Sequence, residues 1–188
     1  MKIFKTISVG LAVMLISLSG HTVSAQDLQK GLEAYQSGDY QTALNEWLPL
    51  AEQGDAAAQG LLGFMYDNSE GVTQDDVQAV KWYRLAAEQG HANAQLNLGL
   101  MYDNGQGVTQ DYAQAVKWYR LAAEQGHAKA QLNLGLMYDN GQGVIQDNVY
   151  AHMWFNIAAS LGQEGASKVR DSFAKGMTAA QIAKAQDL

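Results

Sequence analysis

The chain contains the same 36-residue sequence twice in succession, and this duplication constrains its fold more than any other feature. Residues 75–110 read DDVQAVKWYRLAAEQGHANAQLNLGLMYDNGQGVTQ, and residues 111–146 repeat them with four changes. The changed positions pair Asp76 with Tyr112, Val77 with Ala113, Asn93 with Lys129, and Thr109 with Ile145. A period of roughly 20–50 residues is typical of arrays in which each repeat packs against its neighbours. The sequence therefore predicts a stacked repeat array.

Hydrophobic periodicity predicts two helices in each unit. In the first helix of residues 75–110, the apolar residues share one face, while Lys81, Arg84 and Glu88 lie on the opposite face. Gly90 is predicted to end this helix in the left-handed conformation that glycine tolerates best. The pattern is that of an amphipathic helix with a wide apolar face.

The second helix, expected at Ala92–Asp103, is apolar on two sides. A helix of this kind must lie between neighbours, so a single helix pair cannot bury its own apolar surface and at least three units are needed. Gly99 lies inside this helix, where glycine costs about 1 kcal/mol relative to alanine. We interpret Gly99 as a point where the backbone of a neighbouring helix passes closely.

The predicted order of segments extends this pattern in both directions. Pro49 stands where the twin units have leucine, and it predicts a kink near Asn45–Pro49 or an early end of that helix. Thr178-x-x-Gln181 is a capping-box pattern for a last short helix. The predicted divisions are a signal peptide (1–25), an N-terminal capping helix (26–38), repeat 1 (39–74), repeat 2 (75–110), repeat 3 (111–146), a partial repeat 4 (147–162) and C-terminal capping helices (163–188).

The first 25 residues have the plan of a secretory signal. Lys2 and Lys5 precede an apolar run, Ile7–Leu18, and small residues lead to a predicted cleavage after Ala25. We therefore expect an exported protein, periplasmic or secreted, with no membrane insertion after cleavage. The chain has no cysteine, so disulfides and zinc–thiolate sites are excluded.

Charge limits the choice of partner. Without Lys2 and Lys5 the chain would keep ten basic residues against 19 acidic ones, a net charge of −9. Nucleic-acid binding is driven by neutralisation of phosphates, so this balance argues against nucleic acid as a partner.

The repeated residues resemble those of a known family. The following residues of the second unit are similar to the Sel1-like repeat, a relative of the tetratricopeptide repeat: Ala79, Trp82-Tyr83, Ala86-Ala87, Gly90, Ala94, Leu98-Gly99, Tyr102 and Gly105-x-Gly107-Val108. The resemblance covers residues 39–162. It implies an all-α fold, a right-handed α/α superhelical solenoid of helix pairs, that acts as a scaffold or adaptor.

The catalytic and metal-binding inventory is sparse. His91 and His127 occupy the same position in successive units, about 10 Å apart if the helices pack normally, which is too far to share a metal ion. We expect both to serve at a turn or helix start. Asp103–Gly107 lacks the oxygen ligands of an EF-hand loop, and no strand precedes its Gly-x-Gly as a dinucleotide site requires. The chain is therefore predicted to have no enzymatic activity, no cofactor and no metal.

The best functional candidate is a surface. Lys81 and Arg84 recur as Lys117 and Arg120 on the outward side of the first helices, which line the concave face in solenoids of this type. Glu88 and Glu124 follow the arginines by four residues and offer ion pairs that would explain the stripe without a ligand. The variable positions Tyr112 and Lys129 are added as candidate partner-binding residues, since they either tune recognition or reflect drift.

Three functional hypotheses follow. The favoured one is an exported, non-catalytic module that binds a protein or peptide partner on its concave surface. The second, implied by family resemblance, is β-lactam- or peptidoglycan-related chemistry, although the relatives concerned are cysteine-rich and this chain has no cysteine. The third is a structural spacer that associates with itself. The oligomeric state stays open.

Overall fold

The structure is a computed structural model that describes residues 25–188, and this part of the chain is helical without strands. The predicted signal peptide lies almost wholly outside the described residues. Residues 25–36 are helical. The elements that follow are α2 (Tyr40–Glu52), α3 (Ala56–Asn68), α4 (Asp76–Glu88), α5 (Ala92–Asn104), α6 (Tyr112–Glu124), α7 (Ala128–Asn140), α8 (Asn148–Ser160), α9 (Ala166–Ala174) and α10 (Ala179–Gln186).

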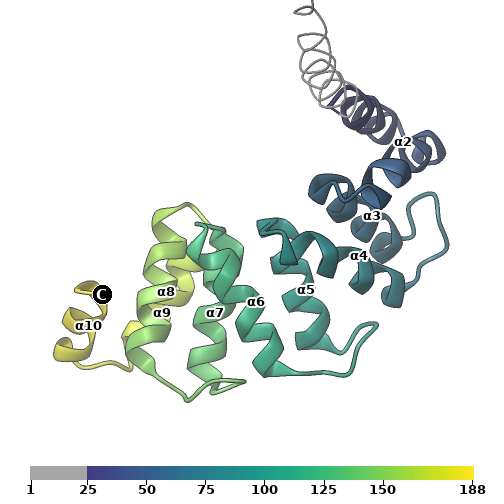
Figure 1. The fold of residues 1–188 in the computed structure, drawn as a ribbon. Helices are drawn as coiled ribbons and strands as arrows, with labels where there is room; N and C mark the ends of the chain where they lie inside the picture. Colours follow the sequence, from purple (N-terminus) through teal and green to yellow (C-terminus); the bar gives the residue numbers. More distant parts are fainter. Residues whose placement is uncertain (1–24) are drawn as a thin grey trace, which may run out of the picture.

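The helices follow one another along a curved path (Figure 1). From α2 to α9 each helix packs against the next in sequence, whereas α10 packs back on α8. Helices α3 and α4, α5 and α6, and α7 and α8 make the most extensive contacts, although each pair joins two predicted units. Contacts between units are therefore at least as extensive as those within them. The prediction of a right-handed α/α solenoid is confirmed.

Caps recur at the same positions of each unit. The first helices begin at aspartates whose carboxylates accept hydrogen bonds from backbone N–H groups of the first turn, namely Asp39, Asp75, Asp111 and Asp147. The second helices α5 and α7 end at glycines in the left-handed conformation, Gly105 and Gly141. Local sequence therefore marks these helix ends before any packing is considered.

The largest fully buried side chains occupy one repeat position: Trp47, Tyr83, Tyr119 and Phe155. A glycine of the preceding second helix lies against each of the last three. A Cβ on Gly99 would stand 2.6 Å from the ring of Tyr119, and Gly63 and Gly135 have the same relation to Tyr83 and Phe155. We expected a helix backbone at Gly99, and this was wrong, because the close neighbour is an aromatic ring.

Two tryptophans join successive units. Trp82 is 8% exposed and packs in the core of the first unit, although it belongs to α4 of the second. Trp118 is 6% exposed and packs in the same way in the core built around Ala79, Tyr83 and Leu98. Each unit thus covers apolar surface that its predecessor leaves open, as the predicted stacking requires.

Buried glutamines form a second link between units. The side-chain amides of Gln59, Gln95 and Gln131 each donate to the carbonyl of the residue eight positions earlier, at 3.0–3.1 Å. Gln89 then donates to Oε1 of Gln59 and Gln125 to Oε1 of Gln95. Oε1 of Gln131 is buried and has no partner, because Leu161 stands where the earlier units have glutamine. We call this set the glutamine ladder.

The loops after the second helices fold back onto the starts of the first helices. Gly107 lies so close to α4 that a Cβ there would stand 2.2 Å from the carbonyl oxygen of Asp76. Gly143 has the same relation to Tyr112. The Gly-x-Gly pattern is therefore a packing device, in agreement with its interpretation as a helix end and turn.

The predictions for the two ends of the array and for Pro49 had different outcomes. Residues 25–36 pack on the first unit through Leu28, Leu32 and Tyr35, and Thr178 forms the predicted capping box with Gln181. The expected early end at Pro49 was wrong, since α2 continues through the proline to Glu52. Only the final turn follows the proline, so few backbone hydrogen bonds depend on it.

Candidate partner-binding surface

Lys81, Arg84, Lys117 and Arg120 lie on the solvent-facing sides of α4 and α6, at the same position in each helix. We call these four residues the basic stripe. Both lysines are exposed, and each ammonium group lies over the indole ring of the next residue, at 5.3 Å for Lys81 on Trp82 and 4.6 Å for Lys117 on Trp118. Such cation–π contacts restrict a side chain that would otherwise be free in solvent.

Tyrosines of the second helices hold the two arginines. A guanidinium N–H of Arg84 donates to the hydroxyl of Tyr102 at 2.7 Å, and Arg120 donates to Tyr138 at 3.0 Å. The Arg84 guanidinium also lies 6.0 Å from the centre of the Tyr102 ring. A guanidinium has five N–H donors, and one hydrogen bond of each arginine is to a tyrosine, so further donors remain for a ligand.

The expected ion pairs with Glu88 and Glu124 do not form. Within residues 25–188, the ion pairs are Lys30 with Glu46 and Arg170 with Asp171, and neither involves the basic stripe. The explanation of the stripe by pairing four residues along the helix was wrong, because the tyrosine hydroxyls take up the arginines instead. No carboxylate within 4.0 Å neutralises these four cations in the described part of the chain.

A pocket of about 270 Å³ opens beside the first half of the basic stripe. Lys81, Arg84 and Glu88 line it together with apolar side chains, and the folded-back loop at Gly107 forms one wall. We call it the α4 pocket. Its apolar lining comes from Val77, Val80, Leu85 and Val108. Exposed apolar surface next to fixed cations suits an amphipathic acidic segment.

The other two predicted residues are not brought into the stripe. Tyr112 is half-buried at the start of α6, where it packs on the core of the third unit under the loop that contains Gly143. Lys129 is exposed on α7 at the repeat position of Asn93, which lines a different pocket. Tyr112 therefore has a packing role, and Lys129 belongs to the face formed by the second helices.

The histidines have the expected role at helix starts. His91 and His127 are the N-cap residues of α5 and α7, and Nδ1 of His91 accepts a hydrogen bond from the backbone of Ala94. His127 instead bonds Oδ1 of Asn93 through Nε2 at 2.9 Å, across the junction of two units. Burial lowers the pKa of both imidazoles. No group of three or more metal-ligating side chains is assembled in residues 25–188.

Sequence reasoning missed one further site. A pocket of about 300 Å³ lies between the helix of residues 25–36, α3 and α5, which are all second helices or their equivalent. We call it the α3 pocket. Gly60 is the sequence feature that could have revealed this pocket, because the later units have Leu96 and Leu132 at that position. The prediction considered what the units share, whereas this pocket arises where the first unit differs.

Comparisons with known proteins identify the repeats. Three consecutive segments, residues 56–91, 92–127 and 128–163, match the Sel1 repeat, and together they cover more than half of the chain. The chain belongs to the Sel1 repeat family. The Sel1 period equals the predicted 36 residues, but each matched segment begins at a second helix, whereas our division begins at a first helix. Comparison with curated proteins gives no match.

Solved Sel1 repeat structures share the fold. A Sel1 repeat protein from Oxalobacter formigenes is 38% identical, with a TM-score of 0.75 over 79% of this chain and 61% of that one. A protective antigen of uropathogenic Escherichia coli is 41% identical, with a TM-score of 0.68 over 77% of this chain and 33% of that one. This chain thus spans less than two thirds of the length of both. Cysteine rich protein B of Helicobacter pylori, at 22% identity and a TM-score of 0.56, shows the fold alone.

Sel1 repeat proteins are typically scaffolds for protein interaction, which agrees with the coarse functional prediction. No helix within residues 25–188 combines the length and the apolarity that crossing a bilayer requires.

Proposed function

We propose that the protein is an exported, non-catalytic adaptor that binds an acidic segment of a protein or peptide partner on the basic stripe. The observation that carries the proposal is that four cations, Lys81, Arg84, Lys117 and Arg120, are positioned by aromatic side chains and left without a carboxylate partner. Prepositioned cations lose less conformational entropy when a ligand binds.

Geometry and charge support an extended or helical acidic ligand. A lysine and an arginine recur at the same positions of the second and third units, so the four cations form a row across two units. The α4 pocket places exposed apolar surface beside Lys81 and Arg84. Arginine forks bind carboxylates in a bidentate manner, and the unused donors of Arg84 and Arg120 suit this contact. On an otherwise acidic chain, a row of cations also directs the ligand to one place.

The test compares charge reversal on and off the stripe. A labelled peptide that alternates glutamate and leucine is titrated against the purified protein by fluorescence anisotropy, with a lysine-for-glutamate peptide as the probe control. Lys117→Glu with Arg120→Glu should weaken binding of the acidic peptide at least about tenfold, as expected for lost charge-assisted contacts. The matched control, Lys168→Glu with Lys175→Glu in the C-terminal region, makes the same charge change elsewhere and should leave binding within about twofold.

Equal binding by the stripe variant and the protein with the native sequence would reject the basic stripe as the site. The natural partner can then be sought by affinity capture with the native and stripe-variant proteins in parallel, followed by mass spectrometry. The ligand would be a protein that the native chain and the Lys168→Glu/Lys175→Glu control both retain, and that the Lys117→Glu/Arg120→Glu variant loses.

The proposed location rests on the signal-like residues 1–25. Cell fractionation, with sequencing of the mature N-terminus, tests export and cleavage after Ala25. A full-length protein found in the cytoplasm would refute both.

Two alternative functions have direct tests. Turnover of nitrocefin by the purified protein would favour β-lactam chemistry over a non-catalytic adaptor. Light scattering at several protein concentrations tests the self-associating spacer, because a spacer should grow in mass with concentration whereas a monomeric adaptor should not.

A further inference from the structure

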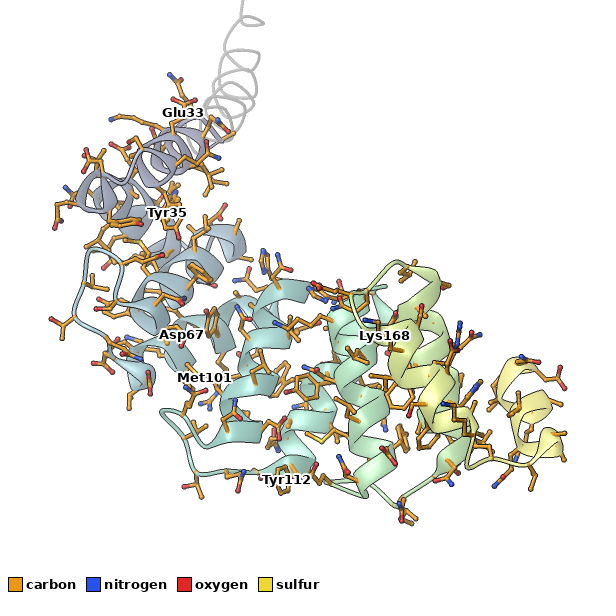
Figure 2. The ribbon with its side chains drawn as sticks, turned by 180° about the vertical axis from the view of Figure 1, so that it is seen from behind. Glu33, Tyr35, Asp67, Met101, Tyr112 and Lys168 are labelled. Carbon is orange, nitrogen blue, oxygen red and sulfur yellow. The ribbon has the colours of Figure 1, made fainter. Side chains whose placement is uncertain are left out.

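The α3 pocket lies mainly on helices that do not carry the basic stripe, and α4 contributes only Tyr83 to its lining. Its floor is α3, one wall is the helix of residues 25–36, and the other wall is α5. Helices α3 and α5 contact each other directly, so the pocket is a defined hollow on the face of the second helices. The lining residues are Leu28, Leu32, Ala57, Gly60, Leu61, Phe64, Tyr83, His91, Asn93, Ala94 and Asn97. In Figure 2, the label of Tyr35 marks the helix of residues 25–36 and the label of Asp67 marks the C-terminal part of α3.

The hollow results from three substitutions in the first unit. Gly60 replaces the leucines of the later units, and a Cβ at this glycine would meet the imidazole of His91 at 3.2 Å. Leu96, the equivalent residue in the second unit, is 6% exposed and fills the corresponding space. Ala57 and Leu61 likewise stand where the second unit has asparagines. The first unit is therefore both more open and more apolar at this place than its successors.

The lining is uncharged. It contains no aspartate, glutamate, lysine or arginine. Its one titratable group that can charge near neutral pH is His91, and burial lowers the pKa of that imidazole, so the ring is neutral at pH 7. Charged ligands would lose hydration here without gaining a counter-charge. A neutral, mainly apolar group fits this chemistry.

Size and geometry narrow the choice further. Small-molecule sites are typically about 300–1,000 Å³, so this pocket is at the lower limit and suits a single ring system. Phe64 is 39% exposed and presents its ring to an incoming aromatic group. Asn93 and Asn97 place amide groups on one wall. Oδ1 of Asn93 already bonds His127, which leaves the N–H donors of that amide for a carbonyl of the peptide that carries the ring.

We propose that the α3 pocket binds one uncharged aromatic side chain of a partner polypeptide, with the peptide backbone lying along Asn93 and Asn97. The α3 pocket binds an uncharged side chain of the partner, whereas the basic stripe, on the first helices, binds its acidic side chains. The two sites use different residues, so the failure of one proposal leaves the other intact.

The test uses amides of single amino acids as probes and follows the NMR signals of the protein. N-acetyl-tryptophanamide, N-acetyl-phenylalaninamide and N-acetyl-alaninamide are titrated into ¹⁵N-labelled purified protein, and chemical shifts are followed by NMR. The aromatic amides should bind with a dissociation constant of about 0.1–1 mM and shift the signals of Gly60 and Asn97. The alanine amide should cause no saturable change.

Two variants separate occupancy from misfolding. Gly60→Leu copies the later units and should weaken aromatic binding at least about tenfold by filling the hollow, because Leu96 shows that a leucine is tolerated at this position beside a histidine. Leu61→Asn also copies the later units and should weaken binding without filling space. Lys168→Glu, in α9 and outside both proposed sites, should leave binding unchanged. Circular dichroism and thermal unfolding confirm that each variant is folded.

Three results would overturn the proposal. The first is equal binding of the aromatic and alanine amides, and the second is unchanged binding in folded Gly60→Leu. The third is binding of free indole as tight as that of N-acetyl-tryptophanamide, which would assign the pocket to a small molecule instead of a peptide side chain.

Discussion

Gln125 donates a hydrogen bond from its side-chain amide to Oε1 of Gln95, at 2.7 Å across the junction of two units. Gln95 in turn donates to the carbonyl of Ala87 and is 3% exposed. This arrangement satisfies both ends of a buried amide, which would otherwise be costly. The glutamine ladder therefore couples one unit to the next through polar contacts within an apolar core.

The ladder predicts that Leu161→Gln stabilises the protein. Leu161 is the C-cap of α8, as Gln125 is of α6, and its separation from Gln131 equals that of Gln125 from Gln95. A glutamine there would reach the unpaired Oε1 of Gln131 and add about 1 kcal/mol to the free energy of unfolding. Urea denaturation checks this gain. Gln125→Leu should have the opposite effect, and a loss of stability in Leu161→Gln would contradict the ladder.

Substitutions at two glycines can separate the energetic cost of backbone strain from that of close packing. Gly90 and Gly107 both have positive φ, at 90° and 64°, but a Cβ on Gly90 meets open space whereas one on Gly107 would stand 2.2 Å from the carbonyl oxygen of Asp76. Gly90→Ala should therefore cost about 1–2 kcal/mol from the left-handed backbone alone. Gly107→Ala should cost about 1–3 kcal/mol more. Equal costs, measured by chemical denaturation, would show that the loop does not pack as described.

Pro49 predicts a stabilising substitution. The twin units have Leu85 and Leu121 at this position, and the proline lies inside α2, where it removes a backbone donor. Pro49→Leu should raise the free energy of unfolding by about 1–3 kcal/mol by restoring the hydrogen bond to the carbonyl of Asn45. Leu85→Pro is the reverse control and should destabilise by about 3 kcal/mol. Thermal unfolding of both variants gives the comparison, and an unchanged midpoint for Pro49→Leu would be unexpected.

Three histidines that are partly or fully buried predict lower stability in mild acid. Burial lowers the pKa of His91, His127 and His152, and the charge of Arg170 lowers that of His152 further. The unfolded chain then binds more protons than the folded chain as the pH falls below about 6.5, so stability present above that pH is progressively lost. The urea midpoint should be lower at pH 5.5 than at pH 7.5.

One substitution tests whether the histidines cause this pH dependence. His152→Gln removes one imidazole and should make the difference between the two midpoints smaller. Burial raises the pKa of Asp67, which has the opposite sign, but that carboxyl titrates mainly at lower pH. A midpoint that is equal or higher at pH 5.5 would contradict the assignment of neutral buried histidines.

The sequence alone determined the helices, their order and their stacking. An exact repeat of apolar and small residues leaves each helix pair with uncovered surface, and only a neighbour with the same pattern can cover it. Local signals such as Asp75 before α4 and Gly105 after α5 fixed the ends of the helices, because capping depends on nearby residues alone. The outward position of the basic stripe could also be predicted, because the amphipathic pattern of a helix depends on its own sequence alone.

Tertiary structure decided which side chains meet across units. The arginines of the basic stripe bond Tyr102 and Tyr138 and not the nearby glutamates, because the tyrosines come from a second helix that sequence spacing does not bring near. Gly99 faces an aromatic ring, and Gly60 opens a pocket, because both depend on how adjacent units pack. Repeat periodicity describes what every unit shares, whereas a binding site arises from contacts and vacancies that exist only once the units are assembled.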